Sequence, residues 1–293
     1  MENKLVIGTA NFGMTYGQGI HAEKLSEKAS KEIIESAKCH GIQTLDTAIS
    51  YDDCSQRLGN IGVKEWKIIT KIPQIPYDIS NVFEWVEHSI CKSIKEIGIS
   101  SFEGILIHNP KDITGVNGEK LLKSLHNLKM RGFTRKIGVS VYEKSEIKDV
   151  LNFFKPDIIQ CPVNILDTRL LSGNYLLKLS KMGIDIHIRS IFLQGILTFP
   201  QNEMPYQFKN YQNEWLNWIY WLRSKELKPV EACVRFVNSI QGVNKILIGV
   251  NSLLQFNEIL GYYQKSSINT HPEWNYNLKN KLLDPRKWNK DPK

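Results

Sequence analysis

The sequence predicts a single (β/α)8 barrel with an active site at the carboxyl-terminal ends of its parallel strands. Three observations favour this fold. The chain has 293 residues, and such a barrel commonly uses about 250 residues as one domain. Strand-like and helix-like segments alternate through eight pairs. Three successive strand-like segments end in ionisable residues, as expected where the loops of a barrel build a site.

The predicted strands are short apolar runs, and apolar residues in the predicted helices recur at helical spacing. The strands cover residues 5–10, 42–45, 66–70, 104–107, 136–141, 158–163, 184–188 and 246–250. The helices include residues 29–37, 58, 80–98, 121–128, 147–151, 175–179, 230–240 and 253–260. Because each strand is followed by a helix, we expect the strands to be parallel.

The first long helix illustrates how its boundaries are predicted. Ser26 can accept a hydrogen bond from the first turn and so act as its N-cap. Ala29, Ile33 and Ala37 fall on one face, which predicts that this face packs on the strands. Gly41 lies just past the end, where glycine is favoured.

An open, doubly wound sheet is the main alternative fold. Residues 17–22 match the glycine pattern of dinucleotide-binding folds in its Gly/Ala form, and Asp46 ends the following strand. That pattern requires a strand to run directly into the glycines and a helix to begin on them. Here the strand ends by Ala10 and the helix begins at Ser26, so we interpret the match as a chance one in a loop.

The chain is basic, with 38 Lys+Arg against 30 Asp+Glu and a formal charge of +8. Residues 1–293 are expected to form one barrel, with a long loop at 196–228 after the seventh strand and a basic, solvated extension at 264–293. The extension includes Lys279, Lys281, Arg286, Lys287, Lys290 and Lys293. We find no aromatic-and-basic repeat or zinc-finger spacing that would favour nucleic acid. A basic surface can equally attract a phosphorylated small molecule.

Cysteine usage and hydropathy indicate the compartment. The five cysteines are odd in number and form no Cys-x-x-Cys pair, which argues for reduced thiols and against a disulfide framework or a zinc site. No apolar run approaches the roughly 18 residues of a membrane span. We therefore expect a cytoplasmic protein without a membrane partner or a bound metal, and leave its oligomeric state open.

Four polar residues near the ends of predicted strands are the candidate catalytic set. Asp46 ends the second strand, and Tyr51 follows five residues later. Lys71 ends the third strand and His108 the fourth. Each alone is most simply a capping acid, a packed ring, a surface lysine or a satisfied histidine. At adjacent strand ends of one barrel, the four together favour catalysis.

The chain resembles the aldo-keto reductase family from Gly8 to about Leu260. The resemblance rests on many short motifs that occur in the family's order at predicted strand ends. They are Gly8-Thr9-Ala10-Asn11-Phe12-Gly13, Leu45-Asp46-Thr47-Ala48 with Tyr51, Thr70-Lys71, Leu106-Ile107-His108, Ile137-Gly138-Val139-Ser140, Gln160 with Asn164, Gln194-Gly195, and Ile248-Gly249-Val250-Asn251-Ser252 with Gln255 and Glu258.

This resemblance implies hydride transfer between a nicotinamide and a carbonyl or alcohol, with Tyr51 as general acid. Lys71 would favour the phenolate of Tyr51 and so ease proton exchange. Asp46 would hold Lys71 in place. His108 would donate a hydrogen bond to the carbonyl oxygen and orient the substrate.

The resemblance also implies a cofactor, NADPH, with NADH possible. Ser140, Gln160 and Asn164 would contact the nicotinamide carboxamide, although Val141 replaces the asparagine usual after the serine. The other implied cofactor contacts are Gly8, Thr9, Arg189, Ser190, Leu193, Gln194, Gly195, Gly249, Asn251, Ser252, Gln255 and Glu258.

Two departures bear on cofactor binding. Arg189 stands where many relatives place a tyrosine that stacks on the nicotinamide, and its guanidinium could stack or pair with a phosphate. No Lys or Arg lies beside Asn251 and Ser252 to neutralise a 2′-phosphate. Both nucleotides therefore remain open.

The expected substrate is a small carbonyl compound. Met14, Tyr16, Pro110 and aromatic residues within 199–227 are candidates for the pocket wall. The segment 189–195 resembles bacterial relatives encoded beside surface-polysaccharide genes, which suggests a sugar or nucleotide-sugar carbonyl.

Two other functional classes remain open. The first is a non-catalytic barrel that binds NAD(P) as a regulatory or partner subunit, and the complete set of four candidate catalytic residues argues against it. The second is a metal-dependent hydrolase or lyase, which would need clustered carboxylates or histidines at strand ends. Asp46 is the only acid that the sequence places there.

Overall fold

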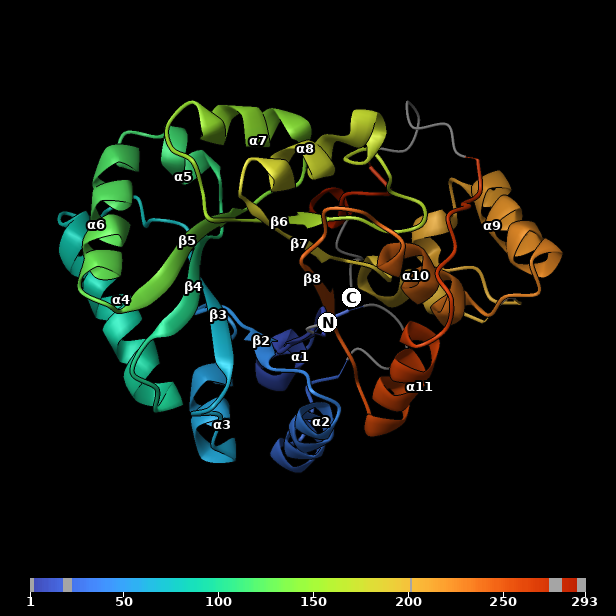
Figure 1. The fold of residues 1–293 in the computed structure, drawn as a ribbon, viewed down its shortest axis with the longest axis horizontal. Coiled ribbons are helices and arrows are strands. Elements are labelled where there is room, and N and C mark those ends of the chain that lie inside the picture. Colours follow the sequence, from blue (N-terminus) through green and yellow to red (C-terminus); the bar gives the residue numbers. More distant parts are fainter. Residues whose placement is uncertain (1–2, 18–22, 201, 274–280, 289–293) are drawn as a thin grey trace.

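A closed parallel barrel forms the centre of the molecule (Figure 1). The computed structural model describes residues 3–17, 23–200, 202–273 and 281–288. Each strand pairs with its sequence neighbours, and β1 closes the barrel against β8. The strands are β1 Leu5–Gly8, β2 Thr44–Asp46, β3 Lys67–Ile72, β4 Phe102–Ile107, β5 Thr134–Ser140, β6 Ile158–Pro162, β7 Asp185–Arg189 and β8 Lys245–Ile248. The predicted (β/α)8 fold is confirmed, and the open doubly wound sheet is wrong.

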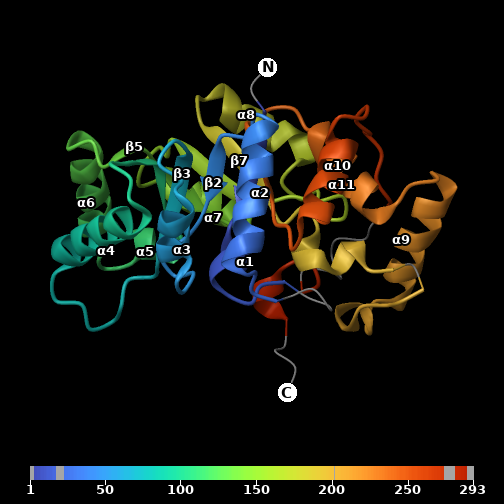
Figure 2. The ribbon, with the colours of Figure 1, turned by 90° about the horizontal axis from the view of Figure 1, so that it is seen from below.

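Helices surround this barrel on its outside (Figures 1 and 2). The helices that the sequence predicts lie close to their predicted positions, whereas α1, α5 and α9 are additional. Ser26 caps α2 by accepting from Ala29 N at 3.2 Å. The α-helices are α1 Ala10–Gly13, α2 Glu27–Cys39, α3 Cys54–Ile61, α4 Val82–Ile97, α5 Lys111–Thr114, α6 Gly118–Met130, α7 Lys144–Leu151, α8 Tyr175–Lys181, α9 Gln212–Ser224, α10 Pro229–Asn238 and α11 Leu253–Tyr263. Short 3-10 turns are η1 Ser172–Asn174, η2 Leu193–Thr198, η3 Tyr206–Phe208 and η5 Pro285–Lys287.

Strand alternation places the polar residues of the site above an apolar layer inside the barrel. Ile69, Leu106 and Ile158 form a cluster separate from the main core between sheet and helices. Side chains two residues apart on a strand share a face. The residues two positions further on therefore point inward at the carboxyl-terminal ends, and they are Lys71, His108 and Gln160.

Two segments differ from the sequence prediction. The expected loop at 196–228 contains α9, whose buried residues Trp215, Trp218, Ile219 and Leu222 have helical spacing. The expected solvated extension is partly docked, since Leu282, Leu283 and Asp284 are buried. The glycine pattern at 17–22 lies, apart from Gly17, outside the described residues.

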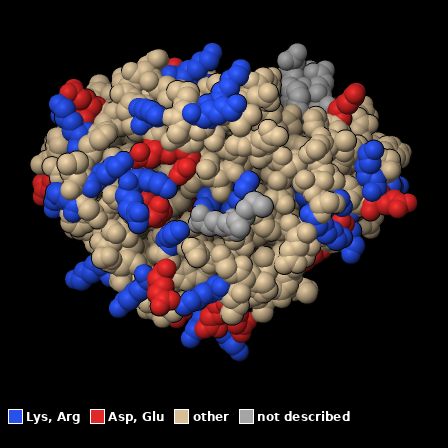
Figure 3. Space-filling view, in the orientation of Figure 1, with Lys and Arg blue, Asp and Glu red and all other residues tan. Residues whose placement is uncertain are grey.

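Surface charge and hydropathy agree with a compact barrel. On the face in Figure 3, Lys and Arg side chains are interspersed with Asp and Glu. Among the helices that the structure describes, none combines the length and the apolar character needed to cross a bilayer. All five cysteines are free, and Cys54, Cys161 and Cys233 are buried.

Candidate active site

A buried ion pair lies at the centre of the site. The Lys71 ammonium on β3 contacts Asp46 Oδ1 on β2 and donates to Thr47 O at 2.9 Å. The side chains are only 3% and 4% exposed. A buried charge needs a partner because desolvation is costly. The two groups therefore fix each other at adjacent strand ends, as the sequence predicts.

Gln160 on β6 extends this pair across the barrel. Its Nε2 donates to Asp46 Oδ2 at 2.7 Å, so both carboxylate oxygens of Asp46 have a partner. Its buried Oε1 has no hydrogen-bond partner. A buried acceptor without a donor is costly, and a ligand amide N–H2 could satisfy it.

Close backbone packing positions Tyr51 above the ion pair. Lys71 Nζ lies 5.6 Å from the centroid of the tyrosine ring. The loop that carries Tyr51 packs against α1 at Gly13, where a Cβ atom would lie 2.1 Å from Tyr51 O. Only glycine permits this approach, so Gly13 helps to set the position of the phenol.

The electrostatic environment raises the pKa of Tyr51. Burial is the main cause, because it disfavours the phenolate, and the negative charge of Asp46 adds to it. Asp46 also pairs with the ammonium of Lys71, so the expectation that Lys71 favours the phenolate stays a prediction. The phenol is therefore kept protonated, as a proton donor requires.

The pKa of His108 is shifted in the opposite direction, downward. Burial and the positive charges of Lys71 and Arg189 lower the pKa of His108 to about 4. At neutral pH its ring is uncharged and carries one N–H donor. His108 follows β4 directly, and its backbone N–H donates to Ile72 O at 3.2 Å. It can therefore donate a hydrogen bond without adding a charge.

One cavity of about 740 Å³ joins the catalytic candidates to the loop before α11. All four candidate catalytic residues line it, which brings the predicted set together. The predicted cofactor residues that line it are Gly8, Thr9, Ser140, Gln160, Arg189, Ser190, Gln194, Gly195, Gly249, Asn251, Gln255 and Glu258. Met14, Tyr16 and Phe199 also line it, as the sequence suggests for the pocket wall.

Three predicted cofactor residues are not part of this lining. Asn164 is used within its own loop, where Oδ1 accepts from Leu166 N at 3.0 Å and from Asp167 N at 2.9 Å. Leu193 is buried in the apolar core. Ser252 caps α11 by accepting from Gln255 N at 3.2 Å. Nor do Pro110, Tyr206, Phe208, Tyr211 and Trp215 line the cavity. The Phe208 ring instead packs at a tilt against Trp215, with ring centroids 5.0 Å apart.

The structure adds wall residues that the sequence analysis did not select. Asn11, after β1, donates to Asn251 Oδ1, after the adjacent strand β8, at 2.7 Å. Tyr142 lies just beyond β5, and Arg189 Cζ lies 4.1 Å from the centroid of its ring. An aromatic residue directly after a strand end was the available signal for Tyr142.

The loop after β7 is backbone-strained beside the cavity. Ser190, Leu193 and Gln194 have φ of 59°, 47° and 54°, although none is glycine. Such residues cost about 1–3 kcal/mol each and cluster at ligand sites. The strain is consistent with a loop shaped to meet a ligand.

The cavity fits an elongated nucleotide cofactor. The orphaned Gln160 Oε1 matches the N–H2 of a carboxamide, and the strained loop and the N-terminus of α11 lie where a pyrophosphate is bound in barrels of this class. Among the described residues that line the cavity, the cations are Lys71 and Arg189. Neither follows β8, so the described lining residues place no cation beside the segment 249–255.

The described residues do not form a metal cluster of the usual kind. They contain no group of three or more His, Cys, Asp or Glu side chains that could hold an ion.

Comparisons with known proteins agree with the geometry. Residues 4–272 match the Aldo/keto reductase family. The structure of the aldo-keto reductase AKR11C1 from Bacillus halodurans, in its holo form, superposes with a TM-score of 0.72 at 17% identity, covering 91% of this chain and 88% of that one. A Pseudomonas aeruginosa structure assigned as an aldo-keto reductase has a TM-score of 0.66 at 19% identity, covering 89% of each chain. The chain therefore belongs to the aldo/keto reductase family.

Proposed function

We propose that this protein reduces a small aldehyde or ketone with NADPH or NADH, and that Tyr51 supplies the proton. The observation that carries the proposal is the buried Asp46–Lys71 pair beneath Tyr51, with His108 in the same cavity. When bound, the reduced nicotinamide would supply the hydride to the carbonyl carbon.

The chain's own residues would direct the proton. Tyr51 Oη donates its proton to the carbonyl oxygen as negative charge develops there, and its raised pKa keeps the proton available. Neutral His108 donates a hydrogen bond to the same oxygen. Lys71 holds a positive charge near the resulting phenolate, and Asp46 and Gln160 hold Lys71 in place.

Cofactor binding follows the cavity. Gln160 and Ser140 would hold the carboxamide, while the loop 190–195 and the segment 249–255 would hold the phosphates. Glu258 is the charged residue of α11 that lines the cavity. A 2′-phosphate would therefore gain little from the described residues, and we expect both nucleotides to be used.

The first prediction concerns Tyr51. Oxidation of NADPH and of NADH is followed by absorbance with 4-nitrobenzaldehyde as the carbonyl. Tyr51→Phe should lower kcat by about 10²- to 10⁴-fold, the usual contribution of a general acid, while quenching of tryptophan fluorescence shows unchanged cofactor affinity.

Tyr220→Phe is the matched control, because Tyr220 is exposed on α9. Wild-type turnover in Tyr51→Phe would remove this phenol from the mechanism. Fluorescence quenching without any oxidation by the wild type would instead favour the non-catalytic NAD(P)-binding barrel.

A further inference from the structure

We propose that Arg189 forms an anion-binding subsite in the catalytic cavity, suited to a substrate that carries a carboxylate or phosphate near its reactive carbonyl, and that Tyr142 and Arg286 hold it in place. The proposal rests on the reductase function proposed above. It adds that the substrate carries a negative charge.

The charge balance of the cavity carries the first step. Lys71 is neutralised by Asp46. Arg189 has no carboxylate within ion-pair distance among the described residues, and its guanidinium contacts Ser190 Oγ and Val141 O, each at 3.2 Å. These contacts use two of the five guanidinium N–H groups. A partly buried cation with donors to spare is a ready partner for an anion.

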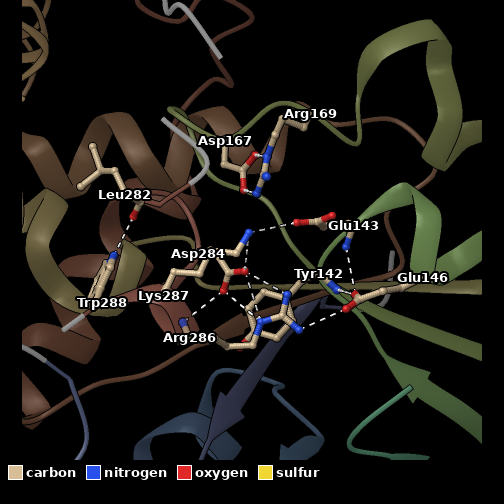
Figure 4. Close-up of polar contacts among 10 residues, drawn as sticks. All are labelled: Tyr142, Glu143, Glu146, Asp167, Arg169, Leu282, Asp284, Arg286, Lys287 and Trp288. Atoms are coloured by element: carbon tan, nitrogen blue, oxygen red, sulfur yellow. Dashed lines mark hydrogen bonds and ion pairs between the residues drawn. The ribbon is translucent and has the colours of Figure 1, made fainter. Parts of the chain in front are cut away.

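The second step compares two arginines on one aromatic ring. Arg189 Cζ lies 4.1 Å and Arg286 Cζ lies 3.6 Å from the centroid of Tyr142. Two guanidiniums cannot occupy the same face of a ring this closely, so the ring lies between them. Figure 4 shows Tyr142 against Arg286, which is bound by acidic side chains. Cation–π contacts favour this arrangement for both arginines.

Among the described residues, acidic side chains compensate the charge of Arg286 but not that of Arg189. Arg286 Nη2 lies 2.9 Å from Asp284 Oδ2, and its Nη1 lies 3.1 Å from Glu146 Oε1 (Figure 4). Arg189, on the cavity side, has no such acid in the described chain. The contrast indicates that the counter-ion of Arg189 is supplied by the ligand.

The position of Arg189 selects the substrate as the source of that anion. Arg189 lines the same cavity as His108 and Tyr51, the proposed partners of the carbonyl oxygen, and its positive charge acts on both. The other acids that line the cavity do not neutralise Arg189. Asp46 is paired with Lys71, and Glu203 and Glu258 are exposed. An anion at Arg189 would therefore lie close to the carbonyl.

The docked segment 281–288 supplies the rigidity that the subsite needs. Asp284 Oδ1 accepts from both the backbone N of Arg286 at 3.1 Å and its Nε at 3.0 Å. Trp288 Nε1 donates to Leu282 O at 2.9 Å, which folds the segment back on itself. Arg286 is thus a positioning residue that acts on Arg189 through Tyr142.

The test compares acidic and neutral substrates of matched shape. The pairs are 4-carboxybenzaldehyde with 4-nitrobenzaldehyde, and glyceraldehyde 3-phosphate with glyceraldehyde. The readout is the ratio of kcat/KM within each pair, together with cofactor affinity from tryptophan quenching. The two pairs show whether a carboxylate or a phosphate is preferred.

We expect the wild type to prefer the acidic member of at least one pair. Arg189→Gln should lower that ratio by roughly 10- to 100-fold, the range for a hydrogen-bonded charge. Arg189→Lys should recover part of it, and Arg286→Gln should lower it by a smaller factor. Arg131→Gln is the control, since Arg131 Cζ lies 4.9 Å from the Phe133 ring centroid and its guanidinium pairs with Glu87, outside the cavity.

Three outcomes would overturn the proposal. One is an unchanged ratio in Arg189→Gln. Another is an equal loss on both members of a pair, which would give Arg189 a role in orienting the nicotinamide. The third is a loss confined to cofactor affinity, which would assign it to the pyrophosphate.

The subsite can be separated from the reductase function. If the wild type reduced none of the four compounds, the function proposed above would fail while the subsite was still tested by titration calorimetry with benzoate and with inorganic phosphate. Binding that is lost in Arg189→Gln and kept in Arg131→Gln would support the subsite. Equal binding, or none, would exclude it.

Discussion

Asp46 holds the candidate catalytic set together, because its carboxylate accepts from both Lys71 and Gln160. A buried carboxylate that loses its counter-ion keeps the cost of desolvation without the compensating attraction. The stability of the site and its chemistry are therefore coupled at this one side chain.

A double substitution separates the two roles. Lys71→Met should lower the free energy of unfolding by about 3–5 kcal/mol, because it leaves the Asp46 charge buried and unpaired. Lys71→Met with Asp46→Asn should recover most of this stability but no activity. Urea unfolding and carbonyl reduction measure the two effects.

Lys38→Met is the control for this cycle, because its pair with Glu65 is exposed and exposed pairs contribute little. A double variant as unstable as Lys71→Met would show that charge pairing is not what stabilises the centre.

At the scale of single residues, the sequence predicted that the four candidate catalytic residues meet, as they do in the cavity, but not what surrounds them. The positions of Asp46, Lys71 and His108 follow from strand ends and alternation. Tyr142 and Arg286 could not be paired in this way, because their contact joins distant parts of the chain and depends on where 281–288 docks.

At the scale of elements, the segment 281–288 packs against one wall of the site, where Arg286 lies on the ring of Tyr142. In Figure 2 the 3-10 turn η5 lies on the same side of the barrel as α1, which follows β1 at its carboxyl-terminal end. Lys287 Nζ pairs with Glu143 Oε1 at 3.4 Å, at the start of α7. The segment therefore joins the loop after β5 instead of extending into solvent.

Releasing this segment should affect the substrate site more than the barrel. Asp284→Ala removes the acceptor that holds Arg286, so amide hydrogen exchange within 281–288 should become faster. The midpoint of barrel unfolding should change far less, because the segment can open locally. The preference for acidic over neutral aldehydes should fall with it.

Glu119→Gln on α6, whose pair with Lys123 is exposed, should leave the exchange of 281–288 unchanged. Slow exchange of 281–288 in Asp284→Ala would show that the apolar contacts of Leu282 and Leu283 hold the segment without Asp284.

Element boundaries were predictable where periodicity was decisive. Helix α9 was expected to be loop although Trp215, Trp218, Ile219 and Leu222 carry a helical period. The same aromatic residues are equally suited to a pocket wall, so their helical spacing alone did not decide between a loop and a helix. The docked 281–288 segment has too few apolar residues to show a period at all.

At the scale of the whole molecule, the alternation of strands and helices was enough to predict the barrel, because parallel strands with short connections have few other arrangements. Inside the barrel, however, polar atoms are buried without partners, including His187 Nδ1 on β7. The pattern that predicts a strand at 184–188 does not reveal that a histidine nitrogen is buried there without a partner.

The buried histidine predicts how stability changes with pH. Burial lowers the pKa of His187 to about 3, whereas an unfolded histidine titrates near 6.5. Below about pH 6.5 the unfolded state binds more protons than the native state, so the free energy of unfolding decreases as pH falls. His108, lowered to about 4, acts in the same direction.

His187→Gln should remove one of the titrating groups that make the free energy of unfolding depend on pH. Between about pH 6 and pH 4, the pH slope of its unfolding free energy should be smaller than that of the wild type by up to about 1.4 kcal/mol per pH unit. Urea unfolding at several pH values measures the slope. Identical slopes in the two proteins would mean that His187 is protonated, or exposed, in the native state.

The position of 281–288 along the chain has a consequence for biosynthesis. All eight strands precede this segment, and the ribosome makes the chain from its N-terminus. A nascent chain that has just completed β8 and α11 can close its sheet, yet it still lacks Arg286 on the ring of Tyr142. Selection among substrates would then be acquired after the barrel itself, as one of the later events in the maturation of the protein.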